Sequence, residues 1–315
     1  MSAETIDWLL AGPHPVRWQV LRDLTDASDD EVRAEQVKAT EQGLVPELLN
    51  AQRPDGTWGG IAWNPGFDST MHALSLLREF GALPEHTTVQ RALERVCANV
   101  TWNGCGPPEC AQNRFFEGET EACINGQVAS AGAYLGCEVH GLVNRLIGEQ
   151  LPDGGWNCEV EYGSTRSSFN STLCVLEALL AYETRFGPNE ASHRARRIGE
   201  KYLLDRHLHR RLSTGEPIGH DRRSGIDWTH PAFPTWWHYD LLRALDYLRA
   251  AGQRPSPFTS EAVDILKSRQ RPDGRWNLET RLSGPTPVEL GGQIGEPDPF
   301  VTLRALRVLK WAESS

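Results

Sequence analysis

The sequence predicts an all-α protein, a barrel of inner and outer helices of the (α/α)6 toroid type. Three observations support this prediction: a turn motif that occurs three times, apolar segments that alternate with amphipathic ones, and no competing pattern of alternating strand residues. The chain has 315 residues, 39% of them hydrophobic, which is enough for one sizeable core. We therefore expect a single α/α-toroid domain over 1–315.

The repeated motif reads Gln-x-Pro-Asp-Gly-x-Trp and occupies 52–58, 150–156 and 270–276. Its Pro-Asp-Gly is a turn signal. The Gln ends a helical pattern, and its amide can bind a free group at the helix end. The Trp follows the Asp by three residues and can lie over the turn. We expect this brace motif to tie one helix to the next.

Apolar and amphipathic segments alternate along the whole chain. Segments that are apolar on more than one face predict buried inner helices, and they lie at 16–24, 69–80, 124–135, 171–182, 237–248 and 300–311. Charged segments with a single apolar stripe predict outer helices, and they lie at about 30–50, 87–99, 138–149, 190–204 and 258–270.

The expected connections differ in length according to their direction. Connections from an inner to an outer helix are short, whereas those from an outer to an inner helix are long and cover about 51–67, 100–120, 151–168, 206–235 and 271–298. In a ring, all the long loops lie at the end where the inner helices begin. Long loops in a compact domain are usually functional, so we expect the functional site at the N-terminal ends of the inner helices.

Charge and composition exclude several classes of partner. A net charge of −10 argues against nucleic acid and anionic membrane surfaces. There is no signal peptide pattern and no apolar run of membrane-spanning length. Seven cysteines, an odd number, favour reduced thiols in a cytoplasmic protein. No phosphate-binding or aspartate-rich magnesium motif is present. The sequence does not indicate an oligomeric state.

The brace motif resembles the repeated Gln–Trp motif of squalene and oxidosqualene cyclases. The segment 302–309 is also similar to bacterial squalene-cyclase-like proteins. The resemblance covers most of the chain, although those cyclases have two α-domains and this chain is long enough for one. It implies a class II terpenoid-cyclase-like enzyme, an isomerase or lyase without a cofactor. Its reaction would be the acid-initiated cyclisation or isomerisation of an apolar isoprenoid or meroterpenoid.

Asp68 matches the acid position of the Asp-x-Asp-Asp-Thr-Ala motif of such cyclases, with Thr70 two residues later. The match is partial, because Gly66 and Ser69 replace the flanking aspartates. A carboxyl group in an apolar cavity can act as a general acid, but an aspartate at this place can equally cap a helix. His72, one helical turn later, would orient or reprotonate Asp68, or would simply pack against a neighbouring helix.

Glu121-Ala-Cys123 resembles the Asp-x-Cys zinc motif of protein prenyltransferase β-subunits, which bind zinc with a later His. His238 is the candidate for that His, so the resemblance implies a possible zinc site of Glu121, Cys123 and His238. The alternatives are a small buried Cys with a hydrogen-bonded His, or a Cys123 that orients Asp68. A zinc-dependent enzyme is therefore a second functional hypothesis.

Aromatic residues gather in the sequence around the long loops and the inner-helix starts. Aromatic rings bind apolar ligands and stabilise cations. We expect the substrate to contact Trp63, Phe67, Phe116, Asn125, Phe169, Trp236, Trp237, Tyr239 and Phe300. A third hypothesis is a non-catalytic toroid that binds a hydrophobic ligand or a partner protein.

Overall fold

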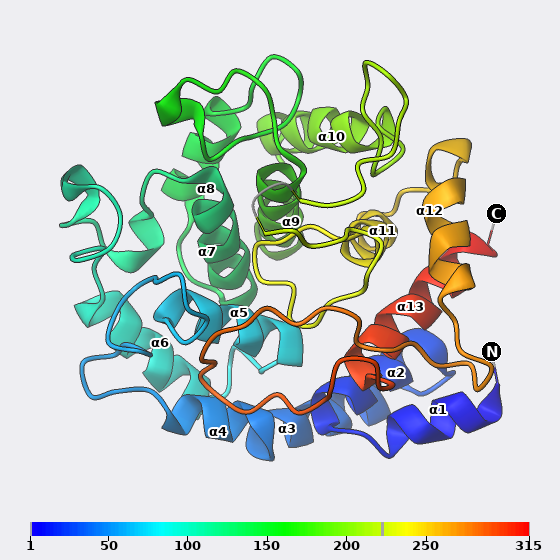
Figure 1. Cartoon of the computed structure of the whole chain (residues 1–315). Coiled ribbons are helices and arrows are strands. Elements are labelled where there is room, and N and C mark those ends of the chain that lie inside the picture. Colours follow the sequence, from blue (N-terminus) through cyan, green and yellow to red (C-terminus); the bar gives the residue numbers. More distant parts are fainter. Residues whose placement is uncertain (1, 222–223, 315) are drawn as a thin grey trace. The chain divides into compact units, whose positions relative to one another are not determined.

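The computed structural model describes residues 2–221 and 224–314 (Figure 1). Within these ranges there are helices and isolated bridges but no strand, which confirms the all-α prediction and agrees with an α/α toroid. The chain forms two compact units. Unit 1 comprises Met1–Glu35, Glu200–Leu282 and Gly291–Ser315, and unit 2 comprises Gln36–Gly199 and Ser283–Leu290. Among the described helices, none combines the length and apolar character needed to cross a membrane.

Unit 2 is built around three buried inner helices. They are α5 (Thr70–Phe80), α7 (Ala122–Leu135) and α9 (Phe169–Phe186), and α7 packs against both of the others. The outer helices are α4 (Leu44–Asn50), α6 (Thr87–Asn99) and α8 (His140–Gly148). Nearly every residue of α7 is buried, as expected for an inner helix. The long loops hold the short turns η1 (Pro108–Cys110), η2 (Phe115–Glu117) and η3 (Val160–Tyr162).

Unit 1 has the same kind of helical pairing. Its inner helix α13 (Pro299–Ala312) packs against α11 (Leu241–Ala250) and α2 (His14–Leu24). The helices α1 (Ala3–Leu10) and α12 (Pro257–Ser268) pack on these. The helices α3 (Asp29–Glu41) and α10 (Glu190–Leu204) each run from one unit into the other.

The predicted alternation of inner and outer helices is confirmed, with three differences. The outer segment at about 30–50 is two helices, because Gly43 takes a left-handed φ of 70° between α3 and α4. The helix α1 was not predicted. The helix α11 begins four residues later than 237, because the carboxylate of Asp240 accepts a hydrogen bond from the backbone N–H of Arg243 at 2.7 Å and so caps the helix.

In all three brace motifs, the Trp links the preceding outer helix to the next inner helix through hydrogen bonds. Each Trp indole N–H donates to a carbonyl near the end of the preceding outer helix, and each Trp backbone N–H donates to a threonine of the next inner helix. The indole acceptors are Leu48, Leu146 and Leu266, at 2.7, 2.6 and 2.9 Å. The threonines are Thr70, Thr172 and Thr302, at 3.2, 3.0 and 3.0 Å. In the second copy, the amide of Gln150 also reaches the Ala195 carbonyl of α10, at 2.9 Å.

Close contact between α7 and α9 depends on Gly126. A Cβ atom at this position would lie 2.7 Å from the backbone carbonyl carbon and oxygen of Cys174. The two backbones therefore approach one another where a side chain would hold them apart. This contact sets the distance between α7 and α9 near their N-terminal halves.

Candidate functional site

The inner helices of unit 2 run in the same direction and begin at the same end. Near their C-terminal ends, the Tyr134 hydroxyl of α7 donates to the Ala82 carbonyl just after α5, at 3.1 Å. At the other end, the backbone N–H of Cys123 in α7 donates to the sulfur of Cys158, which precedes α9. The starts of α5, α7 and α9 therefore share one end of unit 2, which is where the loop lengths predict the site.

Glu121, Cys123 and Cys158 bring potential metal-binding atoms within 4.8 Å of one another at this end. Glu121 is the residue that precedes α7, and Cys123 belongs to its first turn. The sulfur of Cys123 lies 3.7 Å from the carboxylate of Glu121. Of these three residues, the sequence analysis named Glu121 and Cys123 but not Cys158.

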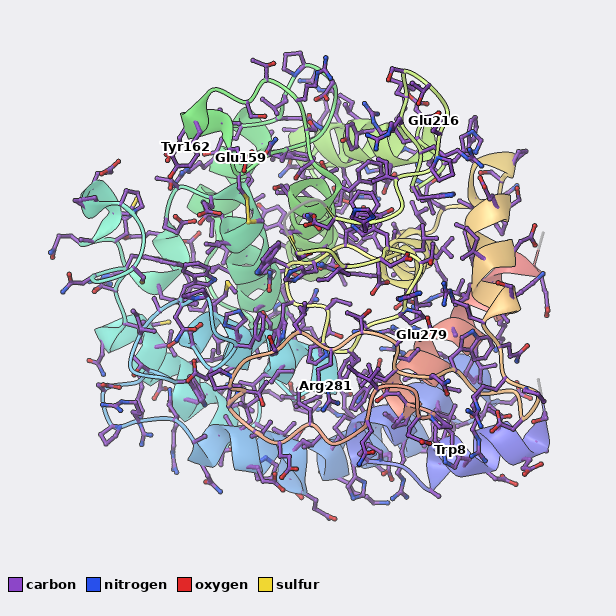
Figure 2. All side chains as sticks on the ribbon, in the orientation of Figure 1. Trp8, Glu159, Tyr162, Glu216, Glu279 and Arg281 are labelled. Carbon is purple, nitrogen blue, oxygen red and sulfur yellow. A yellow bond between two sulfur atoms is a disulfide. The ribbon has the colours of Figure 1, made fainter. Side chains whose placement is uncertain are left out.

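The structure joins Cys123 and Cys158 in a disulfide, the kind of bond drawn in yellow in Figure 2, with their Cα atoms 6.2 Å apart. The expectation of reduced thiols is therefore wrong for this pair. The other five cysteines, all within the described ranges, carry thiols. The bond ties the start of α7 to the loop between the second brace and α9. Glu159 and Tyr162 follow on this loop, and the ring of Tyr162 is 88% exposed (Figure 2).

The second brace and the start of α9 position Cys158. Cys158 follows the second brace, two residues after Trp156. Its backbone N–H donates to the hydroxyl of Ser171 in α9, at 3.2 Å. Its sulfur lies 3.2 Å from the same hydroxyl and accepts the backbone N–H of Cys123 at 3.2 Å. These contacts fix the position of the Cys158 sulfur beside the start of α7.

Glu119 supports the cluster and was missed by the sequence reasoning. Its side chain is 2% exposed, and its carboxylate accepts the backbone N–H of Glu121 at 2.5 Å. Burial raises the pKa of Glu119, because the charged form loses its hydration. The Asn125 amide accepts from the Glu119 N–H and donates to the Glu119 carbonyl, both at 2.9 Å. Asn125, expected to contact the substrate, thus clamps this loop. A single glutamate in a long loop gives no sequence signal.

Asp68 lies one residue before the N-cap of α5. The N-cap residue is Ser69, and Asp68 instead accepts a hydrogen bond from the Asn64 side chain at 2.9 Å. His72 is buried and its Nδ1 hydrogen-bonds with the Ser69 hydroxyl at 2.8 Å. Burial lowers the pKa of His72 to about 3. The ring is therefore neutral at pH 7, and does not supply a proton as an imidazolium.

His238 belongs to unit 1, whereas Glu121 and Cys123 belong to unit 2. Its ring stacks on Trp237 with 3.6 Å between ring centroids. Burial lowers the pKa of His238 to about 4, so the imidazole is neutral at pH 7. Its buried Nδ1 has no hydrogen-bond partner among the described residues. A neutral imidazole of this kind is a competent metal ligand or base, so the predicted role of His238 remains a prediction.

Several aromatic residues that were predicted to contact the substrate pack within the protein. Tyr239 is buried and its hydroxyl donates to the Leu208 carbonyl at 2.6 Å. Phe300 stacks on Phe233 with 3.9 Å between centroids. Both therefore stabilise unit 1. The rings of Phe67, Phe169 and Trp236 are also buried, Phe116 packs edge-on against Phe115, and the buried indole N–H of Trp63 has no hydrogen-bond partner among the described residues.

No protein-family model matches the chain, and no curated protein matches it either. Solved structures do match. A protein from Actinoplanes is 18% identical and has a TM-score of 0.47, over 98% of this chain and 90% of that chain. The type II terpene cyclase MstE from Scytonema is 18% identical and has a TM-score of 0.47, over 98% and 88%. A variant of MstE bound to its substrate, geranylgeranyl dihydroxybenzoate, is 19% identical and has a TM-score of 0.46, over 97% and 87%.

Proposed function

We propose that this protein is a zinc-dependent enzyme that acts on an apolar small molecule, with Glu121, Cys123 and Cys158 as zinc ligands. The observation that carries the proposal is that their ligand atoms lie within 4.8 Å of one another at the start of an inner helix. Thiolate sulfur and carboxylate oxygen are proper zinc ligands, and three protein ligands with an open fourth position are typical of catalytic rather than structural zinc.

Metal binding belongs to the reduced state of the cluster, because a disulfide offers no thiolate to a cation. The N–H of Cys123 and the hydroxyl of Ser171 contact the Cys158 sulfur and hold it at the cluster. Glu119 holds the backbone at Glu121 and so orients the carboxylate. A zinc ion supplies Lewis-acid chemistry, which polarises a substrate oxygen or activates a bound water. Phe67, three residues before α5, and Phe169, the first residue of α9, remain the predicted apolar contacts for the substrate.

We expect about one zinc per chain in protein purified under reducing conditions without a metal-binding tag. Cys123→Ala and Cys158→Ala should each lose the zinc, because two ligands hold it far more weakly than three. Cys97→Ser is the control, because Cys97 lies in α6 and is not part of the cluster, and this variant should retain the zinc. Cobalt substitution gives a second readout, since thiolate ligation produces a charge-transfer absorption band that both alanine variants should lack. A reduced protein that retains no metal, or alanine variants that retain it, would contradict the proposal.

The same preparation tests the predicted His238 ligand. His238→Ala should lower the zinc content or the zinc affinity if the imidazole completes the ligand set, as the prenyltransferase resemblance implies. An unchanged affinity would restrict the set to the three residues of unit 2. In that case, the neutral imidazole remains available to take a proton from a substrate.

A second candidate function is acid-initiated cyclisation or isomerisation of an isoprenoid-type substrate by Asp68. One observation favours it: Ser69, not Asp68, occupies the N-cap of α5, so the carboxyl group is not used as the helix cap. Its partner is the side chain of Asn64. A carboxyl group released from capping is available for general acid catalysis once a substrate excludes water from it.

Asp68→Asn tests this second function. We expect it to reduce turnover of a polyprenyl or prenylated aromatic substrate by at least about 10²-fold, since general acid catalysis contributes that much or more. Substrate binding and melting temperature should stay close to wild type, because asparagine is nearly the same shape. Chelator treatment separates the two functions: it should abolish a zinc-dependent reaction and leave an Asp68-initiated one intact. If both the wild type and Asp68→Asn bind the ligand and neither turns it over, a non-catalytic ligand-binding role is favoured.

A further inference from the structure

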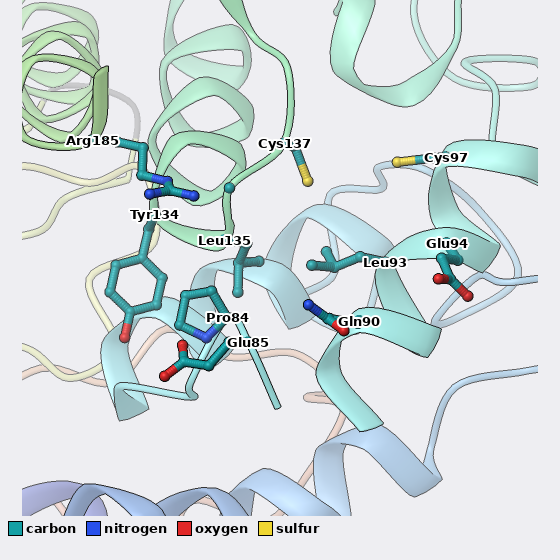
Figure 3. Close-up of a pocket in the computed structure, with 11 residues that line it drawn as sticks. Pro84, Glu85, Gln90, Leu93, Glu94, Cys97, Tyr134, Leu135, Cys137 and Arg185 are labelled. Atoms are coloured by element: carbon teal, nitrogen blue, oxygen red, sulfur yellow. The ribbon is translucent and has the colours of Figure 1, made fainter. Parts of the chain in front are cut away.

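A cavity of about 720 Å³ lies beside the C-terminal end of α7 (Figure 3). The Glu121–Cys123–Cys158 cluster lies at the opposite end of this helix. The walls of the cavity come from α6, from the segment after α5, from the C-terminal end of α7 and from Arg185 near the end of α9. This volume is within the range of small-molecule sites. The proposed function makes no use of it.

Two cysteines line this cavity together. Cys97 is in the last turn of α6 and is exposed, and Cys137 follows directly after α7. Figure 3 shows the Cys97 sulfur pointing toward Cys137, with both sulfur atoms on the same side of the cavity. Cys137 is held in place because Gly136 closes α7 with a left-handed φ of 82°, and because the Cys137 N–H donates to the Gly132 carbonyl at 2.8 Å. A reagent in the cavity therefore meets a pair of thiols.

The two thiols are not equivalent. The hydrogen bond from Cys137 lowers the pKa of Cys97 to about 7, against the opposing effect of partial burial, and Arg114 lowers it further. The same interaction and burial raise the pKa of Cys137. Of the two thiols, Cys97 therefore ionises at the lower pH. An ionised, accessible thiol beside a protonated one is the arrangement of a nucleophile and a resolving thiol.

We propose that this cavity is a thiol–disulfide exchange site for low-molecular-weight disulfides, with Cys97 as the attacking thiol and Cys137 as the resolving thiol. The Cys97 thiolate attacks one sulfur of R–S–S–R, which forms a mixed disulfide and releases RS⁻. Cys137 then loses its proton to solvent and attacks the Cys97 sulfur, which releases the second RS⁻. Overall, one small disulfide is reduced to two thiols, and Cys97 and Cys137 are oxidised to one protein disulfide.

The charges on the cavity wall define the preferred reagent. Glu85, Glu94 and the Cys97 thiolate contribute three negative charges, whereas Arg185 and the nearby Arg114 contribute two guanidiniums. Coulomb attraction therefore favours a disulfide that carries ammonium groups over one that carries carboxylates. Cystamine is the cationic probe, and dithiodiglycolate is the anionic one of similar size.

The first experiment treats the intact, reduced protein with cystamine and maps the products by peptide mass spectrometry. Wild-type protein should gain the Cys97–Cys137 disulfide. Cys137→Ser should stop at a cysteamine adduct on Cys97, because the serine hydroxyl replaces the hydrogen-bond donor but cannot resolve the adduct. Cys97→Ser should give no adduct on Cys137 at pH 7. A wild-type product that keeps both thiols, or one modified first at Cys137, overturns the proposal.

The second experiment measures the rate of Cys97 alkylation by iodoacetamide against pH. The wild-type rate should rise with a midpoint near pH 7, as the thiol ionises. Cys137→Ala removes the donor, so its midpoint should move up toward about 8.5, the value of an ordinary cysteine. Cys137→Ser should stay near the wild-type midpoint. Glu94→Gln, in the same helix as Cys97, should reduce the preference for cystamine over dithiodiglycolate. Identical profiles for all variants would reduce Cys97 to an ordinary surface thiol.

Discussion

Replacing Trp156 with alanine is expected to lower the free energy of unfolding by about 3–5 kcal/mol. The Trp156 side chain is 0% exposed, and a Cβ on Gly199 of α10 would lie 2.8 Å from its ring, so the ring has no free space around it. Its indole N–H donates to the Leu146 carbonyl at 2.6 Å. Alanine at this position would leave a large cavity and an unsatisfied helix end. Chemical denaturation followed by circular dichroism measures the change directly.

Two further variants separate the contributions at this brace. Trp156→Phe keeps most of the ring but loses the hydrogen bond to Leu146, and should cost about 1–2 kcal/mol plus a smaller packing loss. Trp8→Ala is the control, because Trp8 is only partly buried and stacks against Arg275 at the surface. It should be clearly milder than Trp156→Ala. Equal losses at the two tryptophans would show that the brace has no special structural role.

Gly126→Ala is expected to destabilise the protein by about 1–3 kcal/mol, although alanine is the better helix former. The added methyl group would lie 2.7 Å from the Cys174 backbone, which cannot move aside as a side chain can. The helices α7 and α9 must then separate, and the Cys123–Cys158 bond links their N-terminal ends. Thermal unfolding should show a lower melting temperature in both the oxidised and the reduced protein.

The matched control is the same substitution in the outer helix α8. A Cβ at Gly141 would meet no atom within 4 Å, so Gly141→Ala introduces a methyl group into open space. It should stabilise the protein by about 0.5 kcal/mol, because alanine has less conformational freedom to lose on folding. The opposite signs of the two glycine substitutions isolate the helix contact from the intrinsic preference for helix. A stabilising Gly126→Ala would contradict the close approach of α7 and α9.

Most of the helix pattern could be predicted because it rests on local chemistry. The brace motifs mark the turns, and the apolar segments mark the buried helices, so α6 was predicted with the bounds that the structure has. The prediction failed where a helix boundary depends on a side-chain cap or on a single backbone angle. The break at Gly43 depends on a left-handed φ. The late start of α11 depends on the Asp240 cap, which competes with an apolar run that looks helical.

The site could be predicted in position but only partly in composition. Parallel inner helices bring their starts together, so Glu121 and Cys123 could be placed beside the long loops from the sequence alone. The convergence of Cys158 on Cys123 depends on how the second brace directs the chain toward Ser171, which spacing does not reveal. Glu119 acquires its role through burial. Similarly, nothing in the sequence around Cys97 indicates that it is exposed and shares a cavity with Cys137.

The way the chain is divided between the two units has a consequence for protein synthesis. Unit 2 is almost one continuous stretch, Gln36–Gly199, so its helices can assemble soon after the ribosome has made them. Unit 1 requires α2 to meet α13, which lies far later in the sequence and is therefore translated long after α2. During elongation, the apolar face of α2 therefore stays exposed until α13 has been made. A nascent chain arrested before α13 should bind chaperones through the exposed apolar face of α2, while unit 2 is already folded.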